Sequence, residues 1–167
     1  MIETNRVRRE IKVHQMGYNW FSRDQETWKK YPQARKRKHS VYSKHSSRAG
    51  VGFLVHKEIA NNVIEYRSSS ERVAMVVLQL KSMYRVKIVQ VYAPTSTYDD
   101  EVIEDMYEEI NKLFDSVPTK YTMVLGDLNA KIGMRKKGES AIMGKYGIGI
   151  RNERGDRLIE FAASRQL

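Results

Sequence analysis

The chain has 167 residues, of which 41% are hydrophobic and three are proline, as is typical of one globular domain, here residues 1–167. It contains no cysteine, which excludes a disulfide framework and a zinc site with thiolate ligands. No apolar run approaches the roughly 20 residues of a transmembrane helix, and the first residues lack a signal-peptide pattern. The sequence therefore predicts a soluble, intracellular protein.

The net charge of +10 is concentrated at the start of the chain. Residues 1–48 hold 13 Lys and Arg against 4 Asp and Glu, whereas the remaining residues hold 17 against 16. The densest basic stretch contains Arg35, Lys36, Arg37 and Lys38. Such a charge attracts polyanions, of which nucleic acid is the commonest inside cells. The stretch fits direct phosphate contact and a solvated or nuclear-localisation run equally well.

The first half of the chain predicts strands after a long loop. Residues 28–48 are basic and polar without periodicity, which indicates an exposed loop. A short apolar run at 49–55 predicts a strand, and 62–67 predicts a second one. Residues 73–80 and 84–92 are rich in β-branched and large apolar side chains, so they are expected to pair as an antiparallel hairpin.

The second half predicts helix, strand and helix. Apolar residues recur at helical spacing from Val102 to Val117, which predicts an amphipathic helix. Residues 121–125 predict a short buried strand leading into the string Gly-Asp-Leu-Asn at 126–129. Beyond a glycine-rich loop, Asn152 is expected to cap a last helix, inside which the sequence stops. This order of elements predicts an α/β fold with a mixed or mostly antiparallel sheet.

Polar side chains stand where two of the predicted strands end. Tyr92 belongs to the string Val-Tyr-Ala-Pro-Thr, and Asp127 and Asn129 belong to Gly-Asp-Leu-Asn-Ala. Functional side chains collect at strand ends, because the strand fixes their position while the following loop can approach a ligand. Each segment also has a structural explanation, since Asp and Asn after Gly commonly cap turns and a Tyr can close a strand against the core.

Taken together, four strings resemble the endonuclease/exonuclease/phosphatase superfamily, and most nearly the endonuclease domains of non-LTR retrotransposons. They are Arg-Ala-Gly-Val-Gly-Phe from Arg48, Val-Tyr-Ala-Pro-Thr, Gly-Asp-Leu-Asn-Ala-Lys-Ile-Gly, and Asn-Glu-Arg-Gly-Asp-Arg-Leu from Asn152. They occur in the family's order over 47–167. The resemblance implies a two-sheet β-sandwich flanked by helices, and a metal-assisted attack of water on a phosphodiester, most naturally of DNA.

The resemblance also implies roles for individual residues. Asp127 would orient or deprotonate the attacking water, and Asn129 and Tyr92 would donate hydrogen bonds to the phosphoryl oxygens. Asp127 and a glutamate would hold Mg²⁺ or Mn²⁺, hard cations that prefer oxygen ligands. The order of motifs favours Glu3 as that glutamate, whereas Glu26 has neighbours that match the family's letters better. We therefore keep both candidates, with Glu3 preferred.

The family's pattern is incomplete in this sequence. If Glu3 is the ligand, the family's first strand has no counterpart. The closing Ser-Asp-His motif has none either, and the four histidines stand elsewhere: His14, His39, His45 and His56. Because catalytic groups act as a unit, their loss is expected to lower the rate on the order of 10³-fold or more.

The sequence thus predicts a truncated, impaired DNA-nicking domain in which Lys131 joins the basic stretch as a phosphate contact. The alternatives are a non-catalytic nucleic-acid-binding remnant, an enzyme acting on a lipid or small-molecule phosphate ester, and a gene fragment without a stable fold.

Overall fold

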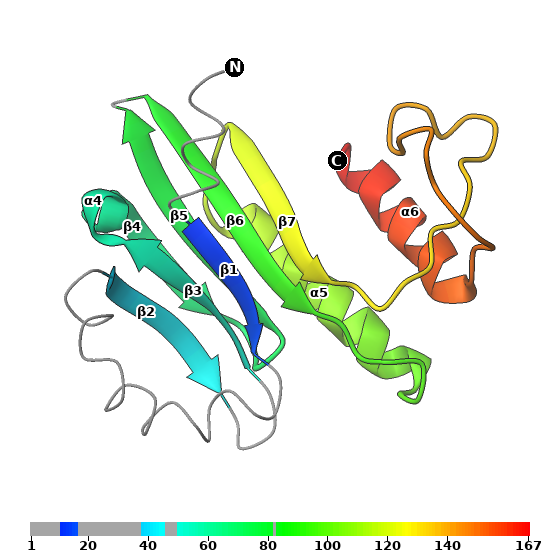
Figure 1. Cartoon of the computed structure of the whole chain (residues 1–167), viewed down its shortest axis with the longest axis horizontal. Coiled ribbons are helices and arrows are strands. Elements are labelled where there is room, and N and C mark those ends of the chain that lie inside the picture. The colour runs from blue at the N-terminus through cyan, green and yellow to red at the C-terminus, as the bar shows by residue number, and fades with distance from the viewer. Residues whose placement is uncertain (1–10, 17–37, 46–49, 82) are drawn as a thin grey trace. The chain divides into compact units, whose positions relative to one another are not determined.

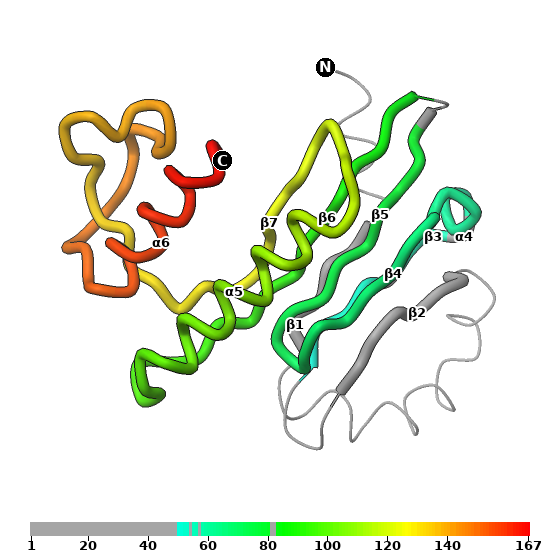
Figure 2. The backbone as a smooth tube through the Cα atoms, turned by 180° about the vertical axis from the view of Figure 1, so that it is seen from behind, coloured from blue at the N-terminus to red at the C-terminus, as the bar shows by residue number. Residues whose placement is uncertain are grey.

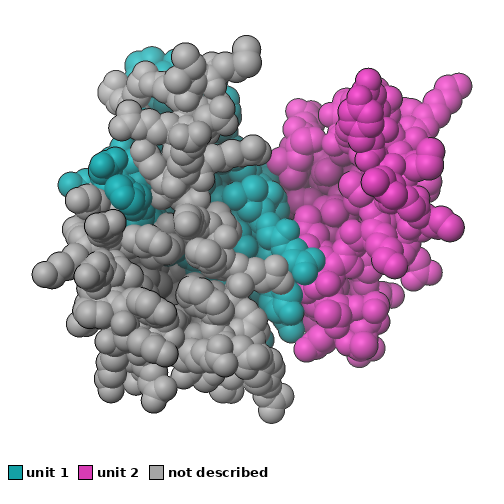
Figure 3. Space-filling model, in the orientation of Figure 1, with its two compact units in different colours: residues 1–92, 108–127 teal, residues 93–107, 128–167 magenta. Residues whose placement is uncertain are grey.

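The computed structural model of the chain describes residues 11–16, 38–45, 50–81 and 83–167. Its backbone divides into two compact units (Figure 3). Unit 1 consists of Met1–Tyr92 and Glu108–Asp127, and unit 2 of Ala93–Tyr107 and Leu128–Leu167.

Unit 1 contains a three-stranded antiparallel sheet of order β1-β3-β2 (Figure 1). The strands are β1 (Ile11–Met16), β2 (Lys38–His45) and β3 (Gly50–His56). Strand β3 confirms the strand predicted at 49–55, whereas β1 was not expected. Val51, Phe53 and Val55 alternate along β3 and are fully buried, as expected for the inward face of a strand.

Strand β2 corrects the predicted basic loop at 28–48. The loop prediction is wrong over Lys38–His45, which pairs with β3 along its length, with one register shift between Lys38 and Ser40. Backbone hydrogen bonds to a neighbouring strand can hold a polar segment in a sheet although its side chains show no periodic signal. The other residues of the predicted loop lie outside the described part.

A second sheet of unit 1 has four strands in the order β4-β5-β6-β7. These are β4 (Val63–Ser68), β5 (Val73–Lys81), β6 (Tyr84–Tyr92) and β7 (Tyr121–Asp127), and the short helix α4 (Lys57–Ala60) precedes them. The pairs are antiparallel except β6 with β7, which is parallel. The predicted hairpin and the mixed sheet are confirmed, and with them the α/β class.

The two sheets of unit 1 share a buried core. Its members are Val51, Phe53 and Val55 of β3, Ala74, Val76 and Leu78 of β5, and Val86 and Ile88 of β6. Residues 73–78 are all fully buried, so both faces of β5 are covered, which explains its continuous apolar run. The two-sheet sandwich of the superfamily stays a prediction.

Strand β7 is present as predicted but is not buried. It lies at the edge of its sheet, and its apolar side chains on one face remain partly open: Tyr121 is 48%, Met123 40% and Leu125 37% exposed. The short apolar run indicated burial, but a strand with one hydrogen-bonded neighbour leaves that face less covered.

Helix α5 (Asp100–Ser116; Figure 2) confirms the predicted amphipathic helix. Its residues from Glu108 onward belong to unit 1. The helix has no basic residue in its last turn. Lys87 of β6 supplies the positive charge that this turn lacks. Its side chain is fully buried, and its Nζ donates to Leu113 O at 2.9 Å and to Phe114 O. A cation at the carbonyl end of a helix is stabilising. Burial lowers the pKa of Lys87, which the charge of Asp115 opposes.

Unit 2 is built on residues 100–107 of α5 and on α6 (Glu153–Arg165). The rings of Tyr107 and Phe161 lie 5.0 Å apart between centroids. Arg157 makes two bonds of 2.6 Å to Glu104, and its guanidinium lies 4.3 Å from the Tyr107 ring centroid. An aromatic contact and a bidentate ion pair therefore hold α6 against this half of α5.

Helix α6 begins as predicted, because the Asn152 side chain accepts from Gly155 N. It does not run to the end of the sequence, as had been expected. Gln166 takes the left-handed conformation that commonly closes a helix, with φ of 54°. Its backbone N–H donates to Ala162 O and Ala163 O.

None of the helices that the structure describes has the length and apolar character needed to cross a bilayer.

Candidate active site at the ends of strands β6 and β7

Tyr92 and Asp127 end the two parallel neighbours β6 and β7 and are register partners. Adjacent strands lie about 4.8 Å apart, and paired residues point to the same face of the sheet. The two side chains therefore stand side by side at one edge of unit 1. Tyr92 is half-buried against the core shared by the two sheets, whereas Asp127 is exposed. A tyrosine and an aspartate thus end neighbouring strands, and a solvent-borne ligand can reach the carboxylate of the aspartate.

Gly126 permits this close approach. It pairs with Val91 and has a φ of +138°, which L side chains rarely adopt. A Cβ at this position would lie 1.8 Å from Val91 O and 2.8 Å from Val91 C. Because both atoms are backbone, no rotamer change could make room. The glycine of the Gly-Asp-Leu-Asn string is therefore required for the position of Asp127 beside Tyr92.

Arg72 holds Tyr92 from its other side. Tyr92 N donates to Arg72 O at 2.9 Å, Arg72 Nη1 donates to Tyr92 O at 3.5 Å, and the guanidinium lies 5.6 Å from the ring centroid. Sequence reasoning missed this residue. Counting the hairpin from its turn places Val73 opposite Tyr92, but a register shift between Gln79 and Lys81 makes Val91 the partner of Val73. Arg72 then takes the place opposite the tyrosine.

In unit 2, Asn129 is held by the segment that follows β6. Its φ is 46°, a left-handed conformation that asparagine tolerates better than most residues. Its Nδ2 donates to Ala93 O at 2.6 Å. This bond fixes the direction of the Asn129 side chain, as is common for an asparagine in a turn. The predicted role of Asn129 toward a phosphoryl group stays a prediction.

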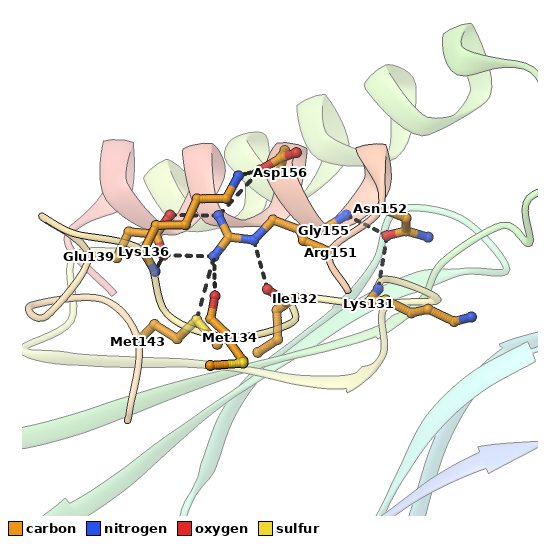
Figure 4. Close-up of polar contacts among 10 residues, drawn as sticks. All are labelled: Lys131, Ile132, Met134, Lys136, Glu139, Met143, Arg151, Asn152, Gly155 and Asp156. Carbon is orange, nitrogen blue, oxygen red and sulfur yellow. Dashed lines mark hydrogen bonds and ion pairs between the residues drawn. The ribbon is translucent and has the colours of Figure 1, made fainter. Parts of the chain in front are cut away.

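Hydrogen bonds of the Asn-Glu-Arg-Gly string connect Lys131, two residues after Asn129, to the start of α6. Asn152 Oδ1 accepts from Gly155 N at 2.9 Å and from Lys131 N at 3.0 Å, and Asn152 N donates to Lys131 O at 3.1 Å. A Cβ at Gly155 would lie 2.0 Å from Lys131 O. Lys131 itself is exposed. The two motifs that the sequence separates by some 20 residues are therefore one hydrogen-bonded structure (Figure 4).

Arg151 organises the loop between β7 and α6. Its side chain is only 5% exposed. Its guanidinium donates to Ile132 O at 2.7 Å, to Met134 O at 3.4 Å, to both carboxylate oxygens of Glu139 at 2.6 and 2.7 Å, and to Asp156 Oδ1 at 3.3 Å (Figure 4). A planar group with five donors suits such a hub. No sequence pattern had indicated it.

The Arg151–Glu139 pair makes the stability of unit 2 acid-sensitive. Hydrogen bonds from Arg151, and then from the backbone N–H of Lys136, lower the pKa of Glu139 from its usual 4.5 to about 2. A depressed folded-state pKa adds stability above the unfolded value, and this is lost as pH falls from about 4.5 through about 2. We expect the difference in free energy of unfolding between wild type and Glu139→Gln to shrink over that range.

Urea unfolding at a series of pH values measures that difference. Glu160→Gln, on the exposed side of α6, is the matched control and should show no such trend. A difference for Glu139→Gln that is the same at pH 3 as at pH 7 would contradict the assignment.

The remaining predicted site residues are not placed. Glu3, Glu26, Arg35, Lys36 and Arg37 lie outside the described residues, and Lys38 begins β2 without a described side chain.

Asp127 is the one predicted metal ligand that is placed. Among the residues that the structure describes, no three His, Asp or Glu side chains gather as a metal site. Mg²⁺ is commonly held by one or two carboxylates, with phosphate oxygens and water completing its shell. An exposed carboxylate at a strand end suits that chemistry, so the residue present fits the cation that the resemblance implies.

Comparison with known proteins finds relatives but no matching protein-family model. The chain is 33% identical over 121 residues to craniofacial development protein 2 of Bos taurus, which covers 72% of the chain and 20% of the bovine protein. The corresponding protein of Tragulus javanicus is 31% identical over 121 residues, covering 72% and 21%. The chain spans about a fifth of the length of these relatives. It is homologous to them over this region, and their family is related to the endonuclease/exonuclease/phosphatase superfamily.

Proposed function

We propose that the chain is a metal-dependent phosphodiesterase domain that nicks DNA, of the type carried by non-LTR retrotransposons. The pairing of Tyr92 with Asp127 at the ends of parallel strands is the observation that supports this most strongly. Homology to a family related to the superfamily agrees with it.

Hydrolysis of a phosphodiester requires an in-line water and stabilised phosphoryl oxygens. Asp127, exposed at the end of β7, would orient or deprotonate the water. Tyr92 and Asn129 would donate hydrogen bonds to the phosphoryl oxygens. Asp127 and Glu3 would hold Mg²⁺ or Mn²⁺, which would neutralise charge on the phosphate.

Arg72 acts in this proposal as a positioning residue. Its backbone and guanidinium contacts to Tyr92 fix the strand end that carries the phenol. The same guanidinium places a permanent positive charge next to the site, which favours the approach of a phosphate. The ring of Tyr92 is thereby held between the core of unit 1 and a cation.

DNA is the proposed substrate because of charge. The net charge of +10 favours a polyanion over a neutral or small ester. Exposed Lys131 follows Asn129 by two residues, and the basic residues at 35–38 add to the same field. We also propose a nuclear location, where such a substrate is found.

Nicking of supercoiled plasmid tests the proposal. We expect the purified chain to convert supercoiled to relaxed plasmid slowly in Mg²⁺, to do so in Mn²⁺, and to stop when EDTA removes the cation. The rate should lie on the order of 10³-fold below that of a complete enzyme, since the Ser-Asp-His motif is absent from this sequence. Relaxation that persists in EDTA would contradict a metal-dependent mechanism.

The second candidate is a non-catalytic nucleic-acid-binding domain. The observation that favours it is the surplus of basic side chains, 30 Lys and Arg against 20 Asp and Glu, because positive charge binds nucleic-acid phosphates with or without cleavage. Plasmid binding that weakens steeply with salt, without relaxation in Mg²⁺ or Mn²⁺, would establish this alternative and exclude the nuclease.

A further inference from the structure

The loop between β7 and α6 carries a row of exposed apolar side chains in unit 2. Tyr146 is 83%, Ile148 92% and Ile150 89% exposed. We call these three residues the loop ridge. A single exposed apolar side chain needs no explanation, but three large ones within five positions mark a surface that binds something.

The glycine between the first two ridge residues holds the loop in place. A Cβ at Gly147 would lie 2.0 Å from Gly133 O and 2.4 Å from Met143 Cε. The backbone at Gly147 therefore packs directly against Gly133. The chain is fixed by this contact between Tyr146 and Ile148, whose side chains remain exposed.

The ridge rests on an ordered base. Ile150 is followed by Arg151, whose guanidinium binds Ile132 O, Met134 O and Glu139. Met143 is 6% exposed, and its carbonyl accepts from Arg135. A ridge held in place in this way loses little conformational entropy when it binds.

The charge around the ridge indicates the partner. Residues 131–150 contain five basic side chains, Lys131, Arg135, Lys136, Lys137 and Lys145, and one acidic side chain, Glu139. Glu139 is bonded to Arg151, and Lys136 to Asp156 at 3.0 Å, which leaves four of the five basic side chains outside these ion pairs. Lys145 Nζ lies 5.0 Å from the Tyr146 ring centroid. A flat aromatic ring beside a lysine, on a basic segment, suits a ligand that has both π-faces and negative charges, as nucleic acid has.

Base faces are accessible to a ring only where stacking is interrupted. In a regular duplex each base is covered by its neighbours, whereas in a single strand or an unpaired stretch it can stack on an aromatic side chain. Tyr146 therefore favours unpaired nucleotides over intact duplex, while lysines alone would bind both.

We propose that the loop ridge is a binding site for unpaired nucleotides, with Tyr146 stacking on a base and Lys137 and Lys145 contacting phosphates. This rests on the proposed function in taking nucleic acid as the substrate. It goes beyond it in naming a site, and an unpaired or locally opened stretch as the form of nucleic acid that is bound.

Fluorescence anisotropy with a labelled single-stranded oligonucleotide in EDTA tests the site without cleavage. Tyr146→Ala should weaken binding about tenfold, because stacking of one base on an aromatic side chain contributes that much. Tyr146→Phe should bind as wild type, since the ring stays. Lys145→Ala should lower the salt slope of the affinity by ~0.7, as expected for one lost phosphate contact to a single strand.

Unit 1 offers a matched control. Tyr121 is 48% exposed, and Lys120 Nζ lies 5.5 Å from its ring centroid. Tyr121→Ala and Lys120→Ala remove the same chemistry elsewhere and should leave oligonucleotide binding unchanged. Thermal unfolding of Tyr146→Ala should match wild type, because the side chain is exposed.

The inference would be overturned by equal affinity of Tyr146→Ala and wild type, by equal losses for Tyr146→Ala and Tyr121→Ala, or by wild-type binding to intact duplex that is tighter than to single strand. Binding of the ridge to an acidic amphipathic peptide but to no oligonucleotide would do the same. The result is separate from the nuclease assignment. If plasmid nicking fails but Tyr146→Ala loses single-strand affinity, the binding site stands; if nicking succeeds and Tyr146→Ala has no effect, only this inference falls.

Discussion

Replacing Asp127 by asparagine is expected to lower the nicking rate by about 10²-fold, the lower end of what a general base contributes, because losses within one catalytic set do not add. The amide has the size of the carboxylate but cannot accept a proton from water or supply an anionic oxygen to Mg²⁺. The pairing of β6 with β7 does not depend on this side chain, so the fold should persist. Plasmid relaxation measures the rate, and Mn²⁺ binding followed by electron paramagnetic resonance gives a second readout that needs no cleavage.

Asp105→Asn is the matched control for this prediction. Asp105 is an exposed carboxylate on α5, so its loss changes the net charge by the same amount without removing a side chain of the proposed site. Asp105→Asn should nick and bind Mn²⁺ as wild type. Equal rates for Asp127→Asn and wild type would show that any nicking comes from another site or from a contaminant.

Local sequence signals were sufficient for most of the regular structure. The spacing of apolar residues predicted α5, and Asn152 predicted the start of α6, because each signal acts within a few residues. The hairpin of β5 and β6 followed from two adjacent β-rich runs. Strands β1 and β2 were not predicted, because both are held in the sheet by hydrogen bonds to β3. Strand β1 is also distant from β3 in the sequence.

The composition of the candidate site was only partly predictable for a related reason. Tyr92 and Asp127 were found because each ends a strand, but their pairing depends on a parallel crossover through α5. Arg72 was missed because one register shift in the hairpin decides which residue faces Tyr92. Arg151 was missed because only the folded loop brings its partners together: two backbone carbonyls, of Ile132 and Met134, and the carboxylates of Glu139 and Asp156.

Gly126→Ala is expected to lower both the stability of the fold and the nicking activity, because Gly126 sets the position of Asp127. The φ of +138° strains any L side chain, and the new Cβ would meet Val91 O. Strain of this kind costs roughly 1–3 kcal/mol, and the backbone contact must be relieved by moving β7 away from β6. We expect urea unfolding to show a loss of about 3 kcal/mol or more in the free energy of unfolding.

Activity should fall further than stability alone explains. The movement that relieves the contact separates Asp127 from Tyr92, and a shift of about 1 Å in a catalytic group can lower a rate by about 10²-fold. Gly138→Ala isolates this effect, because Gly138 also has a positive φ, of +93°, but nothing lies within 4 Å of a Cβ there. Gly138→Ala should therefore cost only the strain and should nick as wild type. If Gly126→Ala matched it in both stability and rate, the close approach of β6 and β7 would not be what places Asp127 beside Tyr92.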